Sequence, residues 1–192
     1  MVKHLLSAVA GLVIVGHPAL AQTSTWIPDK AHSEVDFSIV HMSLSNVRGH
    51  FGNIEGAIVM NETDMTKSTV NVTIDVSTVD TGVAPRDSDL KSSSFFDAAH
   101  YPKANFVSTK VVKSGAGLQI TGDLTLHGVT KPVVLKVEAP IGPVPGMDHK
   151  LHSGFAATTT ISRTAFGIAP KYPAAVVGDE VKLTIDLDVA KQ

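Results

Sequence analysis

Apolar and polar residues alternate along most of the chain, which is the pattern of strands with one buried face. In the clearest run every second residue from Val181 to Val189 is apolar, and the residues between them are Lys, Thr and two Asp. The same period of two recurs at 35–39, 70–76 and 118–126. Because successive strand residues point to opposite faces, these runs predict half-buried antiparallel strands.

Adding the less regular stretches gives eight expected strands separated by turns. They cover residues 33–42, 47–60, 67–78, 104–113, 117–127, 131–139, 152–163 and 180–190. The second of these is long and contains Gly49, Gly52 and Gly56. Glycines at that spacing predict a strand that is kinked or bulged as it bends around a barrel.

The remaining segments predict little helix. Pro85 suits the first turn of a helix, and residues 86–92 contain no breaker, so one short helix is expected there. Residues 140–147 hold three prolines and two glycines and are expected to form a loop. The fold class is therefore all-β. Long strands with glycine kinks favour an eight-stranded antiparallel β-barrel, with one or two short helices, over a sandwich.

Residues 1–21 have a different pattern. A basic start at Lys3 precedes the apolar run 5–15, and small residues lead up to Ala21. This layout predicts a secretory signal peptide that is cleaved after Ala21 and leaves one barrel domain, residues 22–192. A membrane anchor is the rival interpretation, but the run is too short to span a bilayer core of about 30 Å.

Strand alternation is also the pattern of transmembrane barrels, which carry aromatic girdles at both membrane interfaces. This chain has one Trp, two Tyr and seven Phe. Trp26 precedes the first expected strand, and the sequence ends in Ala190, Lys191 and Gln192. We therefore expect no stable insertion into a membrane.

Composition excludes several classes of protein. The hydrophobic fraction of 43% and the formal net charge of −2 argue against disorder. The three arginines, Arg48, Arg86 and Arg163, are scattered, and the sequence contains no run of like charges, which argues against nucleic-acid binding. The absence of cysteine excludes disulfides, thiol nucleophiles and iron–sulfur clusters.

No combination of residues predicts an enzyme. The sequence has no Gly-x-Ser-x-Gly elbow, phosphate-binding glycine loop or dinucleotide fingerprint. His149 and His152 have a spacing that serves a metal on a helix, but they follow the expected loop 140–147. Two solvated loop histidines are the favoured interpretation. We expect no catalytic residue, no metal and no cofactor.

Two polar residues are expected on the apolar side of their strands. His41 shares a face with Phe37 and Ile39, so it is either hydrogen-bonded in the interior, which we favour, or placed to meet the polar end of a ligand. Arg163 follows Ile161 on one face. A buried guanidinium needs a partner, although an arginine at a strand end can also reach water.

An eight-stranded barrel is just wide enough to be filled by side chains or to hold one small ligand. Small residues on the expected strands would leave room for a slender apolar chain, unless they only accommodate packing. They are Gly56, Ala57, Ala104, Gly122, Ala156 and Ala157.

Seven blocks, in order, resemble a known family. They are Asp29-Lys-Ala-His32-Ser33-Glu-Val35-Asp-Phe37 with His41; Val47-Arg-Gly49-His-Phe51-Gly52; Val79-Asp80-Thr81; Arg86-Asp87-Ser-Asp-Leu90-Lys-Ser92; Phe95-Phe96-Asp97 with Tyr101-Pro102; Gly122-Asp-Leu124-Thr-Leu126-His127-Gly128-Val129-Thr130-Lys131-Pro132; and Arg163-Thr-Ala-Phe166-Gly167-Ile168 with Val177-Gly178-Asp179. On these blocks the chain resembles the YceI-like family of secreted bacterial proteins.

The resemblance implies a lipocalin-like barrel that encloses a long apolar ligand, such as a polyisoprenoid, the tail of an isoprenoid quinone or a similar lipid. It also implies a periplasmic location, and it supplies no catalytic residues. The motif residues around Asp80-Thr81 and Arg86-Asp87 are expected to satisfy free backbone N–H groups at the helix start.

Our first hypothesis is a periplasmic carrier or reservoir for such a lipid. His41 and Arg163 are the candidates for contact with the ligand's polar end. The expected cavity lining is Val35, Phe37, Ile39, Val70, Val72, Ile74, Leu118, Ile120, Leu124, Leu126, Phe155 and Ile161.

Two alternatives stay open. One is a quinone- or haem-linked redox partner or enzyme that depends on His41 or His127. The other is a stress-related structural protein whose barrel is filled by its own side chains. A homodimer is also open, and it would use a surface other than a strand edge, because barrel closure removes the edges.

Overall fold

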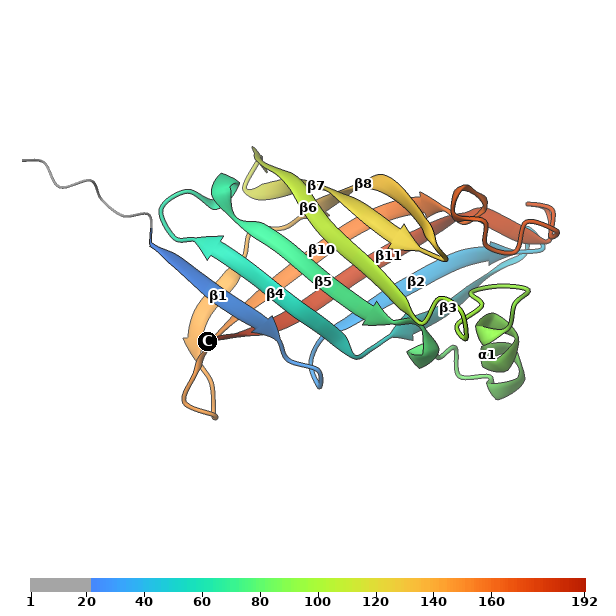
Figure 1. Cartoon of the computed structure of the whole chain (residues 1–192), viewed down its shortest axis with the longest axis horizontal. Coiled ribbons are helices and arrows are strands. Elements are labelled where there is room, and N and C mark those ends of the chain that lie inside the picture. Colours follow the sequence, from blue (N-terminus) through green and yellow to red (C-terminus); the bar gives the residue numbers. More distant parts are fainter. Residues whose placement is uncertain (1–21) are drawn as a thin grey trace, which may run out of the picture.

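A computed structural model describes residues 22–192, whose strands close into an antiparallel barrel (Figure 1). The strands are β1 (Thr23–Pro28), β2 (Glu34–His41), β3 (Ser45–Phe51), β4 (Ile54–Asn61), β5 (Thr69–Asp75), β6 (Lys103–Ser114), β7 (Gly117–Leu126), β8 (Val129–Val137), β9 (Ile141–Pro145), β10 (Leu151–Ser162) and β11 (Val177–Lys191). The helices are α1 (Ala84–Lys91) and the 3-10 turns η1 (Met65–Lys67), η2 (Val76–Thr78) and η3 (Thr164–Phe166).

Pairing between β10 and β11 closes the ring. The neighbours around it are β11, β1, β4, β5, β6, β7, β8 and β10, and this ring of eight antiparallel strands confirms the predicted fold class. In Figure 1, α1 lies at one end of the barrel, together with the turn between β2 and β3. The start of β1 and the C-terminus lie at the other end.

At two positions around the barrel, two consecutive strands with a break between them take the place of one long strand. β1 pairs with residues 189–191 of β11, and β2 pairs farther along the same edge of β11. Their partners follow the same division, because β4 pairs with β1 and β3 pairs with β2. The expected strand 47–60 is therefore interrupted at Gly52 and Asn53, as its glycines indicated.

Side-chain hydroxyls replace backbone pairing at both breaks. The Ser33 hydroxyl donates to the Asp188 carbonyl (2.9 Å) and accepts from the Asp188 N–H (3.1 Å). At the second break the Gly52 N–H donates to the Thr78 hydroxyl (3.1 Å). Because an unpaired backbone group is costly once buried, these hydroxyls let the two strands break without unsatisfied backbone groups.

Two strands were not predicted from the sequence, β1 and β9. The expectation of a loop at 140–147 is wrong, because residues 141–145 pair with β10 as β9. β9 is the last strand in the sheet order and has one neighbour, so Pro143 and Pro145 are tolerated on it. The expected short helix is confirmed as α1, with proline in its first turn.

The predicted signal peptide, residues 1–21, lies outside the described residues. Within 22–192, no helix is both long and apolar enough to cross a bilayer.

The substitution Ser33→Ala tests the break between β1 and β2. Ser33 is 4% exposed, and the loss of its hydroxyl leaves the Asp188 N–H without this acceptor, whereas the Asp188 carbonyl still accepts from the Asp29 N–H (2.8 Å). We expect the free energy of unfolding to fall by about 1–3 kcal/mol, the typical cost of buried unsatisfied groups. Urea denaturation measures it.

The matched control is Ser38→Ala, at a half-buried position within β2. We expect it to change the free energy of unfolding by less than about 0.5 kcal/mol. Equal destabilisation by both substitutions would contradict the role of the Ser33 hydroxyl.

Candidate functional site: an apolar cavity inside the barrel

Two adjoining cavities lie inside the barrel. The first, of about 140 Å³, is bounded by Leu90 of α1, and we call it the α1-side cavity. The second, of about 130 Å³, is bounded by Met65 of η1, and we call it the η1-side cavity. The residues that line both are Val35, Ile74, Leu124 and Leu183. The two cavities therefore meet at a common wall.

All twelve residues predicted to line a cavity do line one. Val35, Ile74 and Leu124 line both; Phe37, Ile39, Leu126 and Ile161 line the α1-side cavity; Val70, Val72, Leu118, Ile120 and Phe155 line the η1-side cavity. The apolar face of each strand therefore points inward, as the alternation indicated. Their role in binding a ligand stays a prediction.

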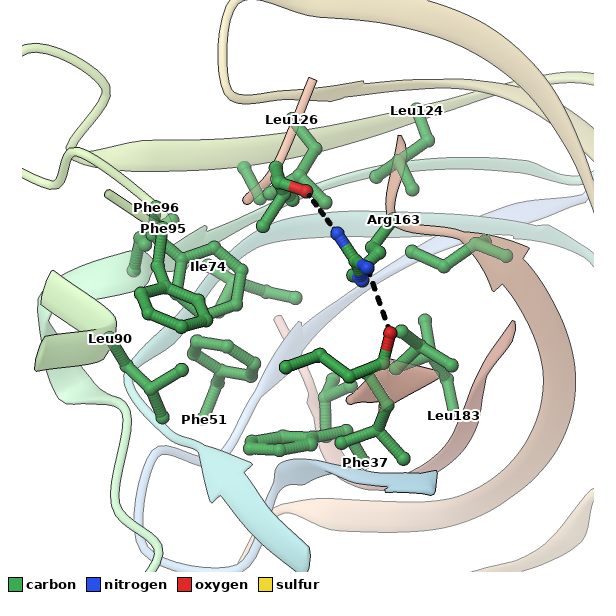
Figure 2. A pocket seen from close by; sticks show the side chains of 18 residues that line it. Phe37, Phe51, Ile74, Leu90, Phe95, Phe96, Leu124, Leu126, Arg163 and Leu183 are labelled. Carbon is green, nitrogen blue, oxygen red and sulfur yellow. Dashed lines mark hydrogen bonds between the residues drawn. The ribbon is translucent and has the colours of Figure 1, made fainter. Parts of the chain in front are cut away.

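Aromatic residues that the sequence analysis did not select form one end of the α1-side cavity (Figure 2). The ring of Phe51 lies 5.5 Å from that of Phe37 and meets Phe96 edge-on at 5.4 Å. Phe95, which also lines the cavity, stacks on Tyr172 at 5.3 Å. The adjacent pair Phe95-Phe96 was visible in the sequence, but a segment without strand periodicity gives no face to assign.

The connection that leads into α1 pairs with the barrel at Asp80, which forms a β-bridge with His50 of β3, and hydrogen bonds to Thr81 then hold the start of α1. The Arg86 side chain donates to the Thr81 hydroxyl (2.8 Å) and carbonyl (3.0 Å). The Asp87 carboxylate accepts from the Thr81 N–H (2.9 Å). The motif residues at the helix start therefore position α1, so that Leu90 lies at the cavity wall.

Arg163 lies in the wall of the α1-side cavity, and it is only 3% exposed. Its side chain donates five hydrogen bonds, all to backbone carbonyls: Nε to Gly178 (2.9 Å), one terminal nitrogen to Ile168 (3.0 Å) and Ala169 (2.6 Å), and the other to Tyr172 (2.6 Å) and Val177 (2.8 Å). A guanidinium has five N–H donors, so every one is used. Figure 2 shows two of these bonds across the cavity wall.

These bonds argue against the prediction that Arg163 meets the polar end of a ligand. The buried guanidinium has its partners, as a buried charge requires, but they are the carbonyls of the segment 168–178. No donor is left for a ligand. The bonds fasten that segment at one end of the barrel instead.

Asp179 of β11 holds the start of η3 through hydrogen bonds to Arg163 and Thr164. Its backbone carbonyl accepts from the Arg163 N–H (2.9 Å), and its carboxylate accepts from the Thr164 hydroxyl (2.6 Å) and N–H (3.1 Å). Hydrogen bonds from the Thr164 and Ser162 hydroxyls hold the pKa of the Asp179 carboxyl below its ordinary value. The ionised carboxylate of Asp179 is therefore favoured, and it accepts hydrogen bonds at Thr164, the first residue of η3.

The structure places His41 away from the ligand space. His41 is the last residue of β2, where the barrel ends, so it is exposed and lines neither cavity. The expectation of a buried histidine is wrong for this reason. His127, the other candidate, contacts the Phe166 carbonyl (3.2 Å) and the Tyr101 ring (4.8 Å), and it also lines neither cavity.

The small residues of the expected strands differ in whether they line a cavity. Ala104 and Ala157 line the cavities. Gly122 does not, because the ring of Phe106 occupies the space that a Cβ at Gly122 would need. Ala57 and Ala156 also lie outside both cavities.

The exposed wall of both cavities is apolar, although Ser68 and Thr159 are among the residues that line the η1-side cavity. Within residues 22–192, no nitrogen or oxygen atom is exposed on the wall of either cavity. Arg163 is the one ionisable residue among those that line them. Such a wall binds hydrocarbon through burial of apolar surface and dispersion contacts, and it offers no hydrogen bond to a headgroup.

Fold and cavity together define a lipocalin-like barrel with an apolar interior. The sequence model of the YceI-like domain matches residues 26–189, so the chain belongs to the YceI-like family. The protein YceI of Escherichia coli is 39% identical over 161 residues, which cover 84% of this chain and 83% of that protein. A UPF0312 protein of Vibrio parahaemolyticus is 36% identical over 170 residues, covering 86% of this chain and 89% of the relative.

Solved structures agree with this assignment. The YceI protein of Campylobacter jejuni matches with a TM-score of 0.71 and 30% identity, over 80% of this chain and 90% of its own. BcnA of Burkholderia cenocepacia matches with a TM-score of 0.71 and 25% identity, over 84% and 98%. A domain from Saccharophagus degradans, described as polyisoprenoid binding, shares the fold with a TM-score of 0.62 and 14% identity, over 89% and 100%.

The substitution Arg163→Met tests the role of the buried guanidinium. It leaves five backbone carbonyls without their Arg163 donors, so we expect the free energy of unfolding to fall by at least about 1–3 kcal/mol, the typical cost of buried polar groups left unsatisfied. Arg163→Lys keeps the charge but has three donors, and we expect an intermediate loss. Urea denaturation ranks the variants.

Arg48→Met is the control, because Arg48 is exposed on β3. We expect it to change the free energy of unfolding by less than about 0.5 kcal/mol. An Arg163→Met protein as stable as the wild type would refute the assignment.

Proposed function

We propose that this protein binds a long apolar chain inside its barrel, such as a polyisoprenoid, the tail of an isoprenoid quinone or a similar lipid. The observation that carries the proposal is the pair of adjoining cavities whose walls expose no polar atom. The polar end of the ligand then lies outside the cavities. The Saccharophagus degradans domain, described as polyisoprenoid binding, supports this ligand class through its shared fold.

The cavity volumes favour binding over a barrel filled by its own side chains. In another protein an apolar cavity of about 150 Å³ stays dry and binds benzene, which is close in size to each cavity here. Each cavity therefore takes about one isoprene unit without rearrangement. A longer chain extends beyond the cavities or displaces lining side chains.

An energy estimate gives the chain length that binding requires. Ten buried carbons contribute about 8 kcal/mol at about 0.8 kcal/mol each, and association costs at least about 4 kcal/mol. Micromolar affinity needs a net of about 8 kcal/mol. The ligand must therefore bury roughly 15 carbons or more, which points to a chain of at least three isoprene units.

We place the protein in the periplasm, as a carrier or reservoir rather than an enzyme. The support is the signal-peptide pattern of residues 1–21 and the chemistry of the cavity walls, where the one ionisable side chain has all its donors occupied.

Filling the η1-side cavity tests the proposal. Ala157 lines this cavity and is 6% exposed, so the ring in Ala157→Phe takes up ligand space. We expect uptake of a 20-carbon prenol from detergent micelles, measured by native mass spectrometry, to weaken at least about tenfold, which corresponds to the loss of about two buried methylenes.

Thr158→Phe is the matched control, because it adds the same ring at the neighbouring, exposed position of β10. We expect this variant to take up prenol like the wild type. Equal uptake by the wild type and both folded variants would show that the prenol binds elsewhere, and no uptake by the wild type would refute the proposed function.

A further inference from the structure

A mixed group of imidazole and carboxylate side chains lies outside both apolar cavities, where β1 ends beside β10 and β11. The ligand atoms of Asp29, His152 and Asp188 all lie within 4.8 Å of one another, and all three residues are half-buried. None of the three lines either apolar cavity. His152 and Asp188 instead border a separate surface cavity of about 370 Å³.

His152 has a carboxylate at each ring nitrogen. Nδ1 lies 2.6 Å from Asp188 Oδ1, and Nε2 lies 3.1 Å from Asp148 Oδ1. In metal sites a ligating histidine almost always donates its other N–H to a carboxylate, a backbone carbonyl or a water molecule, which fixes the orientation of the ring. Asp148 occupies that position, which leaves Nδ1 to face Asp188.

Asp29 is also oriented by its neighbours. One carboxylate oxygen accepts from the Ala31 N–H (2.8 Å), and the other lies 3.1 Å from His32 Nδ1. The backbone fixes Asp29 relative to Asp188, because the Asp29 N–H donates to the Asp188 carbonyl (2.8 Å). Three segments distant in the sequence are thus held together by barrel pairing, so the side chains are pre-positioned.

We propose that Asp29, His152 and Asp188 bind a divalent transition-metal ion of the Zn²⁺ type, with Asp148 and His32 holding the ligands in place. One imidazole and two carboxylates form a three-ligand set that Zn²⁺ accepts, with a fourth position open toward the surface cavity. Imidazole disfavours Mg²⁺ and Ca²⁺, which take oxygen ligands.

Zinc binding requires the ligand atoms, which lie within 4.8 Å of one another, to adjust their separations. Donor atoms around a tetrahedral zinc lie about 3.3 Å apart, given metal–ligand distances of about 2.0–2.1 Å. The 2.6 Å contact between His152 and Asp188 therefore lengthens by less than about 1 Å as the ion enters, and the proton on Nδ1 leaves to solvent.

The sequence spacing His149-x-x-His152 contributes to this site through His152 alone. His149 has a left-handed backbone conformation (φ 65°) in the turn before β10, and it is not among the converging residues. The partner of His152 is Asp188, 36 residues farther along the chain. The favoured interpretation of both histidines as solvated loop residues is wrong for His152, which is a half-buried residue of β10.

Isothermal titration of the purified, chelator-treated protein with Zn²⁺ tests the proposal. We expect one Zn²⁺ per chain, with no competition from Mg²⁺ or Ca²⁺. Asp29→Asn leaves the His152 contacts to Asp188 and Asp148 intact, and we expect it to weaken Zn²⁺ binding at least about tenfold. Asp148→Ala removes only the outer partner of His152 and is expected to weaken binding about 10–100-fold.

Two controls make the assignment specific. His100→Ala removes a histidine that contacts one carboxylate, Asp97 (2.9 Å), and it should leave Zn²⁺ binding unchanged. His50→Ala removes the imidazole of a second group, Glu34, Asp36 and His50, and should also have no effect. No Zn²⁺ uptake by the wild type, unchanged affinity in folded Asp29→Asn, or loss of binding in His50→Ala would each overturn the proposal.

Discussion

The pairing of β11 with three strands is the constraint on which the rest of the structure depends. Along one edge β11 pairs with β10, from Ala190 opposite His152 to Glu180 opposite Ser162. Along the other edge it pairs with β1 and then with β2. The inward side chains of β11 line both cavities, so the same alternation closes the barrel and provides its apolar wall. It also places Asp188 between Ser33 and His152.

The buried polar groups beside the barrel interior hydrogen-bond to other protein groups, and for this reason they leave the cavity walls apolar. Arg163 is buried at the cavity wall, and the carbonyls of the segment after η3 use all its donors. The hydroxyls of Ser33 and Thr78 form hydrogen bonds with backbone groups at the strand breaks. With these groups satisfied, the cavities select a ligand by shape and apolarity, and they exclude headgroups because desolvating a polar group without a new partner is costly.

The sequence predicted the parts of the site that depend on period two. The barrel class and all twelve lining residues followed from alternation, because strand geometry converts parity directly into an inward or outward direction. The ring strand β1 did not, because its six residues were not recognised as a strand. The sequence could not predict what depends on long-range packing. Phe95 and Phe96 reach the cavity from a segment without periodicity. The ring of Phe106 occupies the space beside Gly122. His41 is the last residue of its strand, at the end of the barrel. Arg163 was correctly expected to need partners, but backbone carbonyls leave no pattern in a sequence.

The central claim is that the barrel interior is a binding site for an apolar chain. The most direct test is native mass spectrometry of the protein purified from its own host without added lipid, followed by release and identification of any bound molecule. The account predicts a co-purifying lipid with a hydrocarbon chain of roughly 15 carbons or more, at one molecule per barrel. Repeated recovery of an empty barrel, or of a small polar ligand, would contradict it.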